Sequence, residues 1–347
     1  MTKTKAWGVT AAGKPLAPLT IDRREPGPRD VVIDVLFCGV CHSDIHQAKD
    51  EWGNGTWPMV PGHEIVGRVV ARGKDVTKLA LGDLAGVGCL VNSCRDCAPC
   101  RAGDEQFCER GMVPTYNGTE LDRKTPTYGG YSTGMVVDEA FVLKIPAGLD
   151  PAGAAPLLCA GITTYSPLKH AGTKAGDQVG VVGLGGLGHM GVKLAVSMGA
   201  KVTVFSTSTA KEADARRLGA TDFVVTKGDG LSKAHKHFDL IIDTVSAPHD
   251  YAPYLDLLRP RGRLTIVGAP PTPSSLHAFS LIMGGRSLVG SLIGGLAETQ
   301  EMLDHCGKHG VVSDIEVIPM EKINEAYARV LASDVRYRFV IDLASLR

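Results

Sequence analysis

The sequence predicts an α/β protein in which an antiparallel, barrel-like β domain is followed by a doubly wound parallel sheet. Three observations predict this class. The length of 347 residues favours two cores over one. Up to about residue 150 the chain is irregular and rich in Gly and Pro, with short β-branched runs. From about Asp177, apolar runs alternate with helical stretches, which is typical of buried parallel strands joined by helices.

The β-branched runs of the first region, such as Val31–Val35 and Ile65–Val70, predict strands of the antiparallel domain. Two predicted helices of the second region stop at Gly199 and Gly219, because glycine readily adopts the left-handed conformation that ends a helix. Six apolar runs of the second region predict its parallel strands: Val179–Val182, Val202–Phe205, Phe223–Val225, Leu240–Asp243, Leu264–Val267 and Leu288–Ser291.

The last residues form a helical stretch and two further runs, Ile315–Pro319 and Arg338–Ile341. We place them back on the first domain, because the six-stranded sheet is complete without them. The predicted division is therefore residues 1–158 for the first domain, 159–297 for the second, and 298–347 for a segment that completes the first.

Composition excludes several classes of partner. The chain carries 37 basic and 37 acidic residues, so it has no electrostatic footprint for nucleic acid or an anionic membrane. The first residues hold charge but no apolar stretch of a signal peptide, and no run of about 18 apolar residues could span a bilayer. We expect a cytoplasmic protein with no nucleic-acid or membrane partner.

Four of the nine cysteines follow a metal-binding spacing. In a reducing compartment such crowding indicates metal rather than disulfides. A ferredoxin-type iron–sulfur run would carry Pro after a late cysteine, whereas Glu109 follows here, so zinc is favoured. Four sulfurs leave no open position, so we interpret the site as structural. Its ligands are Cys94, Cys97, Cys100 and Cys108, while Cys38, Cys89 and Cys306 have no spacing partner and are interpreted as free thiols.

A second metal site is predicted from separated residues. Catalytic zinc takes three protein ligands and leaves one position open. Cys41 and His63 supply two, and Cys159 is the best candidate for the third. Cys159 stands where the first domain passes to the second, so we expect this metal in a cleft between domains. Each residue alone would be interpreted as structural, and it is the combination with a nucleotide motif that favours zinc.

The nucleotide motif is a glycine-rich turn that follows a predicted strand and opens a helix, where helix N-terminus and glycines suit a pyrophosphate. The next strand ends without the acid that binds an NAD ribose. Hydroxyls and a cation there suit a 2′-phosphate, although residues 206–209 would also cap the next helix. NADP(H) is favoured, with predicted contacts at Gly183, Gly185, Gly186, Leu187, Gly188, Ser206, Thr207 and Lys211.

These motifs resemble a known superfamily over the whole chain. The pattern that starts at Gly62-His63-Glu64 and continues through Gly67, Gly73 and Val76 looks like the zinc alcohol dehydrogenase signature of medium-chain dehydrogenases/reductases. Residues 57–64, 128–131 and 334–342 resemble the cinnamyl alcohol dehydrogenase subfamily, and residues 156–168 its bacterial NADPH-dependent aldehyde reductases. The resemblance implies a GroES-like catalytic domain, a Rossmann cofactor domain, and a homodimer formed through the cofactor domain.

The resemblance also implies roles for single residues. Cys41, His63 and Cys159 are implied as catalytic zinc ligands, with Glu64 as an alternate ligand. Asp44 would hydrogen-bond the far nitrogen of His63, which fixes the imidazole tautomer. Ser43 would contact the substrate oxygen, and His46 would pass its proton to solvent, since histidine titrates near neutral pH. Further implied contacts are Thr163, Val267 and Arg338 for the cofactor, and Trp52 and Leu292 for the substrate pocket.

We therefore predict a zinc enzyme, with two zinc ions per chain, that moves a hydride between NADP(H) and a primary alcohol/aldehyde pair, as a broad-specificity aldehyde reductase. One alternative is an NAD-linked polyol or secondary-alcohol dehydrogenase on the same fold. A zinc-ribbon nucleic-acid binder is disfavoured by the balanced charge. A zinc-free quinone-reductase relative would lack Cys41 and the four-cysteine loop.

Overall fold

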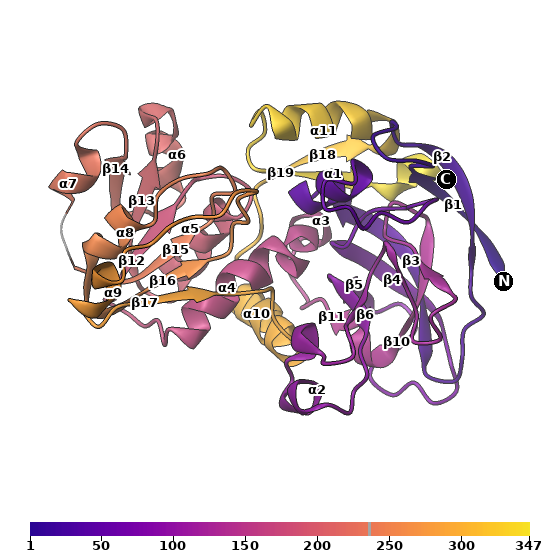
Figure 1. Ribbon diagram of the computed structural model, residues 1–347. Coiled ribbons are helices and arrows are strands. Elements are labelled where there is room, and N and C mark those ends of the chain that lie inside the picture. The colour runs from indigo at the N-terminus through magenta and orange to yellow at the C-terminus, as the bar shows by residue number, and fades with distance from the viewer. Residues whose placement is uncertain (235–236) are drawn as a thin grey trace. The chain divides into compact units, whose positions relative to one another are not determined.

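The computed structural model describes residues 1–234 and 237–347, which divide into two compact units (Figure 1). The first unit comprises Met1–Cys159 and Gly294–Arg347, and the second comprises Ala160–Ile293. A mostly antiparallel sheet forms the first unit and a parallel sheet the second, so the predicted fold class is confirmed.

A seven-stranded sheet forms the centre of the first unit. Its longest strand, β3 (Asp30–Gly39), pairs with β10 over its first half and with β19 at its end. Val31, Ile33 and Val35 alternate into the core and are fully buried. The strand order is β11-β5-β4-β3-β19-β18, with β10 paired to β3 outside this path. The other strands of the sheet are β4 (Ile65–Arg72), β5 (Leu84–Val87), β10 (Gly134–Asp138), β11 (Leu143–Lys144), β18 (Ile315–Pro319) and β19 (Arg338–Asp342).

Shorter elements complete this unit. Three two-stranded sheets are formed by β1 (Thr2–Gly8) with β2 (Ala17–Arg23), β6 (Leu90–Asn92) with β7 (Val113–Pro114), and β8 (Gly118–Thr119) with β9 (Pro126–Thr127). The helices are α1 (His42–Ala48), α2 (Ala98–Ala102), α3 (Pro151–Ala154), α10 (Leu296–His309) and α11 (Ile323–Leu331). The 3₁₀ turns are η1 (Glu105–Phe107), η2 (Glu139–Phe141), η3 (Ala155–Leu158), η5 (Met320–Lys322) and η6 (Leu343–Leu346).

The C-terminal tail returns to the first unit, where β19 joins β3. Its two strands, β18 and β19, pair in parallel, which departs from the antiparallel pattern expected for this domain. The reason is the connection between them. The helix α11 runs between the two strands and carries the chain back to its starting edge, as a parallel pair requires.

The second unit is built on a six-stranded sheet in which every pair is parallel. The strand order is β14-β13-β12-β15-β16-β17. Successive strands are added on one side of β12 and then on its other side, which is the strand order of a Rossmann sheet. Each strand overlaps one predicted apolar run: β12 (Gln178–Val182), β13 (Lys201–Ser206), β14 (Asp222–Val225), β15 (Phe238–Asp243), β16 (Leu258–Ile266) and β17 (Ser287–Gly290). The helices are α4 (Ala160–His170), α5 (Gly188–Ser197), η4 (Thr209–Lys211), α6 (Glu212–Arg217), α7 (Gly230–Lys233), α8 (Ala252–Leu257) and α9 (Phe279–Ile282).

The hydrophobic core of the second unit holds together the strands whose carboxyl ends form the expected ligand-binding edge of the sheet. Phe205 of β13 packs edge-to-face on Phe238 and Tyr254, with ring centroids 5.4 and 5.7 Å apart. The packed strands end together at the edge where the order reverses, which is where open α/β sheets bind their ligands. The glycine-rich turn lies at this edge, between β12 and α5.

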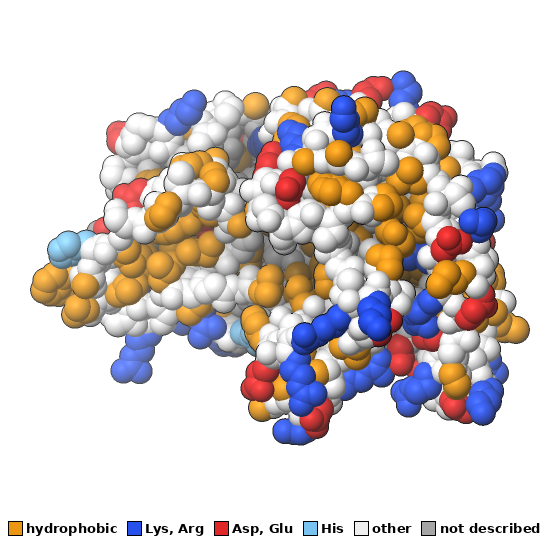
Figure 2. All heavy atoms as spheres, turned by 45° about the vertical axis from the view of Figure 1, so that its right-hand side comes forward, with side chains coloured by type: hydrophobic (Ala, Val, Ile, Leu, Met, Phe, Trp, Pro, Cys, Tyr) orange, Lys and Arg blue, Asp and Glu red, His pale blue; other side chains and the backbone are white. Residues whose placement is uncertain are grey.

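Two surface properties agree with the composition. On the face shown in Figure 2, basic and acidic side chains are interspersed rather than gathered into one basic stretch. Among the described residues, no helix has both the length and the apolar character needed to cross a membrane.

Candidate metal centres and cofactor turn

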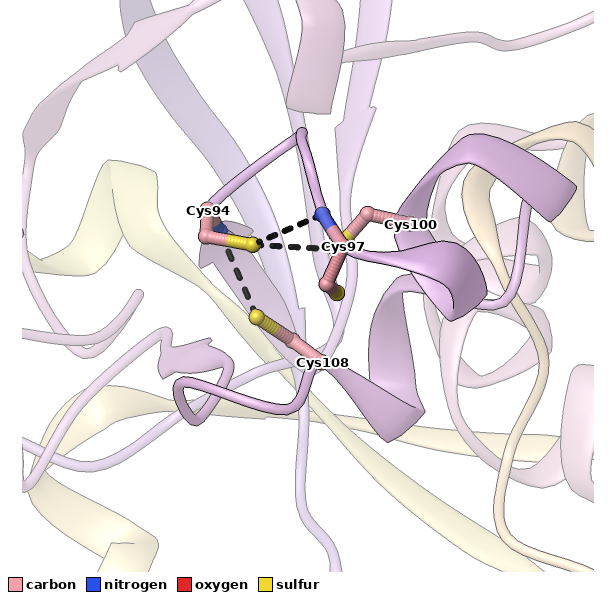
Figure 3. Close-up of side chains that lie close together, drawn as sticks. All are labelled: Cys94, Cys97, Cys100 and Cys108. Carbon is pink, nitrogen blue, oxygen red and sulfur yellow. Dashed lines mark hydrogen bonds between the residues drawn. The ribbon is translucent and has the colours of Figure 1, made fainter.

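The four spaced cysteines converge in one loop of the first unit, and their sulfurs point toward one another (Figure 3). Cys94 follows β6, Cys97 and Cys100 lie at the start of α2 and within it, and Cys108 follows η1. The ligand atoms of all four lie within 4.8 Å of one another. The Sγ atoms of Cys94 and Cys100 are 3.9 Å apart. This is a closed group of four sulfur donors.

Backbone amides surround these sulfurs. The Cys94 N–H donates to Cys108 Sγ and the Cys97 N–H to Cys94 Sγ, both at 3.4 Å, and the Glu109 N–H donates to Cys97 Sγ at 3.5 Å. The N–H groups of Asp96 and Cys97 lower the pKa of the Cys94 thiol to about 6. Amides that stabilise thiolates, without any cationic side chain among them, fit a tetrahedral zinc ion held by four sulfurs.

The second group is assembled from distant segments of the first unit. Cys41 stands at the N-terminus of α1, His63 and Glu64 precede β4, and Cys159 follows η3. Their ligand atoms lie within 4.8 Å of one another and all four residues are buried. The Sγ atoms of Cys41 and Cys159 are 3.9 Å apart. Two sulfurs, an imidazole and a carboxylate are a donor set that fits zinc.

The position of His63 depends on the turn before it. Gly62 has φ of +102°, and a Cβ there would lie 2.7 Å from both Cys38 Sγ and the Tyr131 ring. Only glycine fits this conformation and this space. The Asp44 carboxylate then holds the ring, since its Oδ1 is 3.1 Å from His63 Nδ1 and leaves Nε2 for a metal.

Asp44 is itself fully buried and surrounded by donors. Its oxygens accept the N–H groups of Cys41 at 2.9 Å and Gly62 at 3.1 Å, and the Tyr131 hydroxyl at 3.2 Å. One carboxylate thus orients both Cys41 and His63.

The neighbours of Cys41 and His63 shift the pKa values of these two residues in opposite directions. The hydrogen bond from Cys159 and the nearby His63 lower the pKa of the Cys41 thiol well below its ordinary value. Burial lowers the pKa of His63, but the Asp44 carboxylate outweighs it and raises that pKa well above its ordinary value. A more basic imidazole is a stronger electron-pair donor to a metal.

Glu64 differs from the other members because it has a cationic partner. The Arg338 guanidinium pairs with Glu64 Oε1 and donates to the Val40 carbonyl at 2.9 Å. Glu64 Oε2 is buried and has no hydrogen-bond partner in the described structure. Burial raises the pKa of Glu64 to about 8 despite Arg338. A bound cation would satisfy a carboxylate that has an unpartnered buried oxygen and lies in one group with two thiols and an imidazole.

The residues expected in proton transfer lie on α1. The Ser43 hydroxyl is 3.7 Å from Cys41 Sγ. The His46 side chain is 30% exposed, so it reaches solvent, and its Nδ1 hydrogen-bonds Glu51. The exposed Trp52 ring lies 5.3 Å from the His46 ring. Ser43 therefore lies beside the buried Cys41, and His46 with Trp52 lies toward the surface.

The cofactor turn lies wholly in the second unit. Gly183 has φ of +86°, and a Cβ on Gly188 would lie 2.0 Å from the Gly183 carbonyl, so the turn closes tightly on the helix. Lys211 crosses from η4 and donates to the Leu184 carbonyl at 2.8 Å, which brings its ammonium beside the turn. Ser206 ends β13, where the chain offers hydroxyls but no acid.

The remaining predicted contacts are distributed over both units. Thr163 is buried on α4, and Val267 follows β16 with its N–H donating to the Asp243 carbonyl at 2.9 Å. Leu292 is half exposed in the second unit. Arg338, expected among the cofactor contacts, lies in the first unit beside Glu64. Ser208, rather than Ser206, caps η4 by accepting the Ala210 N–H.

Sequence reasoning missed the contacts that Tyr131, Arg338 and Glu51 make with Asp44, Glu64 and His46. Tyr131 and Arg338 stand far from their partners in sequence, and nothing local marks them as partners of Asp44 and Glu64. Glu51 lies five residues after His46, and an acid so close to a proposed relay histidine was a signal that could have been used.

Comparison with known proteins identifies relatives of the whole chain. Residues 27–147 match the family model described as the alcohol dehydrogenase GroES-like domain, and residues 186–308 match the model described as zinc-binding dehydrogenase. Aldehyde reductase YahK of Escherichia coli is 54% identical over 99% of both chains. NADP-dependent alcohol dehydrogenase C 1 of Mycolicibacterium smegmatis is 54% identical over 100% of both chains.

A solved structure agrees with these relatives. The crystal structure of CAD from Helicobacter pylori complexed with NADP(H) is 43% identical, covers 99% of this chain and 98% of its own, and superposes with a TM-score of 0.93. The likeness extends through both units of the chain.

Proposed function

Because the chain belongs to the zinc-binding dehydrogenase family, with an alcohol dehydrogenase GroES-like domain, we propose that it transfers a hydride between NADP(H) and a primary alcohol/aldehyde pair. We propose further that it acts as a broad-specificity aldehyde reductase. The observation that carries the proposal is the buried group of Cys41, His63 and Cys159, oriented by Asp44. This donor set and its charged neighbour are those of a catalytic zinc site.

In this proposal each cluster holds one zinc ion. Cys94, Cys97, Cys100 and Cys108 hold the structural ion. Cys41, His63 and Cys159 hold the catalytic ion, with Glu64 as the alternate donor. The catalytic ion supplies Lewis acidity, which makes a substrate hydroxyl easier to deprotonate and a carbonyl easier to reduce.

The protein's own residues then move the proton. Ser43 contacts the substrate oxygen, since its hydroxyl lies beside Cys41 at the buried end of α1. His46 exchanges the proton with solvent, and Glu51 holds its ring in place by accepting from Nδ1. A histidine suits this step because its charge changes near neutral pH.

The cofactor assignment rests on the end of β13. Ser206, Thr207 and Lys211 offer hydroxyls and an ammonium to a 2′-phosphate, and the contact of Lys211 with Leu184 supports a position beside the glycine turn. An NAD enzyme would carry an acid at this strand end.

The experiment is a set of specificity constants for aliphatic and aromatic aldehydes, each measured with NADPH and with NADH. Higher kcat/KM with NADPH on primary aldehydes is the expected result. Preference for NADH with a polyol or a secondary alcohol would replace this function by the polyol dehydrogenase alternative.

We also propose a homodimer that forms through the cofactor unit. The edge strand β17 has no neighbour on its outer side in the described sheet. Beside it, α9 exposes Phe279 (58%), Ile282 (64%) and Met283 (78%), and hydrophobic side chains gather over this end of the unit in Figure 2. An unpaired edge with an apolar surface favours pairing with a second copy. Light scattering should give the molar mass of a monomer for the Ile282→Glu variant. If that variant is still a dimer, this surface is not the dimer interface.

A cytoplasmic location is proposed from the thiols. In the described residues none of the nine cysteines forms a disulfide, and the two proposed zinc sites need six of them as reduced ligands. Fractionation of the native host should place the protein with cytoplasmic markers, and recovery with an exported fraction would contradict this.

A further inference from the structure

Cys89 is a thiol that neither metal cluster includes, although it lies against one of them. It stands between β5 and β6 in the first unit, and its carbonyl accepts the Thr115 N–H at 3.1 Å. Its Sγ lies 3.8 Å from the carbonyl of Leu158, the residue before Cys159. The sequence spacing of Cys89 predicted a free thiol without a partner, and the fold places it beside a proposed zinc ligand.

The backbones that carry Cys89 and Cys159 are in close contact. A Cβ on Gly88 would lie 2.9 Å from the Leu158 carbonyl, so only glycine allows this approach. The Cys89 and Cys159 thiols lie close enough to shift each other's pKa, and Cys159 Sγ is 3.9 Å from Cys41 Sγ. Three thiols therefore follow one another, with Cys159 in the middle.

Accessibility separates the three thiols. Cys41 and Cys159 are each 8% exposed, whereas Cys89 is only partly buried. The thiol that a small oxidant reaches first is thus the one that zinc binding does not need. An accessible thiol next to a second thiol is the arrangement of reversible redox sites.

We propose that Cys89 is an oxidation site, at which a hydroperoxide converts Cys89 and Cys159 to a disulfide and so removes a ligand of the catalytic zinc. The proposal rests on the zinc site proposed above. Nothing in the hydride-transfer chemistry uses Cys89.

The chemistry balances in two steps. The Cys89 sulfur attacks a peroxide oxygen, the O–O bond breaks, and Cys89 becomes a sulfenic acid while water leaves. The Cys159 sulfur then attacks the Cys89 sulfur, the S–S bond forms, the S–O bond breaks, and a second water leaves. Two thiols lose two electrons in total and hydrogen peroxide is reduced to two waters. A thiol reductant reverses the disulfide.

The test compares the wild-type holoenzyme with Cys89→Ser and with Cys306→Ser, a matched control at a buried cysteine on α10. Each protein is treated with hydrogen peroxide, released zinc is followed with a chromogenic chelator, and disulfides are mapped by mass spectrometry after free thiols are alkylated. We expect wild type and Cys306→Ser to release one zinc per chain in a fast phase, with a Cys89–Cys159 disulfide. Cys89→Ser should lose that fast phase.

Zinc release by Cys89→Ser at the wild-type rate would overturn the proposal, as would a disulfide between Cys41 and Cys159 instead. Zinc content before oxidation separates this failure from failure of the proposed function. If Cys159→Ala protein keeps as much zinc as wild type, the proposed zinc site is wrong. If Cys159→Ala has lost one ion while Cys89 has no effect on oxidation, only the redox role is wrong.

Discussion

The four-cysteine cluster takes all its sulfurs from residues 94–108, whereas the cluster of Cys41, His63, Glu64 and Cys159 draws on three separate segments of the first unit. The local cluster is surrounded by backbone N–H groups and has no carboxylate or imidazole in it. The assembled cluster holds buried charges, namely Asp44, Glu64 and Arg338. In the proposed function the local cluster holds a structural ion that stabilises its own loop, whereas the assembled cluster is positioned by the fold around it.

The largest expected effect is on the local cluster. Cys97→Ser removes a sulfur from a loop of short elements, so its folding depends on the ion. We expect a loss of stability of about 4 kcal/mol or more, as is typical when a structural metal is lost. Thermal denaturation measures it. The control is Asp96→Asn, which alters an exposed neighbour in the same loop and should leave the melting temperature unchanged. Equal melting of Cys97→Ser and wild type would remove the structural role.

The next largest effect is expected on proton transfer beside the assembled cluster. His46→Ala should lower kcat by ~10² to 10⁴ because a general acid–base step is lost, with zinc content intact. Glu51→Gln should change kcat in the same direction by less, since it only holds the ring. The measurement is the pH profile of kcat, together with partial rescue by added imidazole. An unchanged profile in His46→Ala would take this residue out of the proton path.

Cofactor choice is expected to change by less. Ser206→Asp places an acid where a 2′-phosphate is proposed, and should raise KM for NADPH by about 10- to 100-fold because facing like charges repel. Ser206→Ala is the matched control, because it removes the hydroxyl without adding charge. Steady-state kinetics with both cofactors measures the change. If KM for NADPH is the same in Ser206→Asp and wild type, the end of β13 does not recognise the phosphate.

The smallest effect concerns the surface end of α1. If Trp52 stacks on an aromatic substrate, Trp52→Ala should lower the kcat/KM ratio of benzaldehyde to a short aliphatic aldehyde by about 2- to 13-fold, which corresponds to ~0.5–1.5 kcal/mol. Trp52→Phe keeps a ring and should keep most of the ratio. A ratio that does not move in Trp52→Ala would mean that Trp52 only packs on His46.

The two clusters also differ in how far sequence could predict them. The spacing of the four cysteines places their sulfurs together almost without regard to the rest of the fold. By contrast, Cys159 stands 118 residues after Cys41, and they were joined only by the place of Cys159 between the two domains and by the family resemblance. The parallel sheet of the second unit could be predicted from the sequence, because buried parallel strands are short apolar runs. The Arg338–Glu64 pair and the parallel pairing of β18 with β19 were not, because both depend on where the tail docks.

The most direct test of two metal centres with separate roles is the zinc content of purified protein, measured with activity and folding on the same samples. Wild type should contain two zinc ions per chain, one in the four-cysteine site and one in the catalytic site. Cys159→Ala should remain folded, contain one zinc ion and lose activity, because the ordered fold does not depend on the catalytic metal. One ion or iron in the wild type, or two zinc ions retained by Cys159→Ala, would contradict this account.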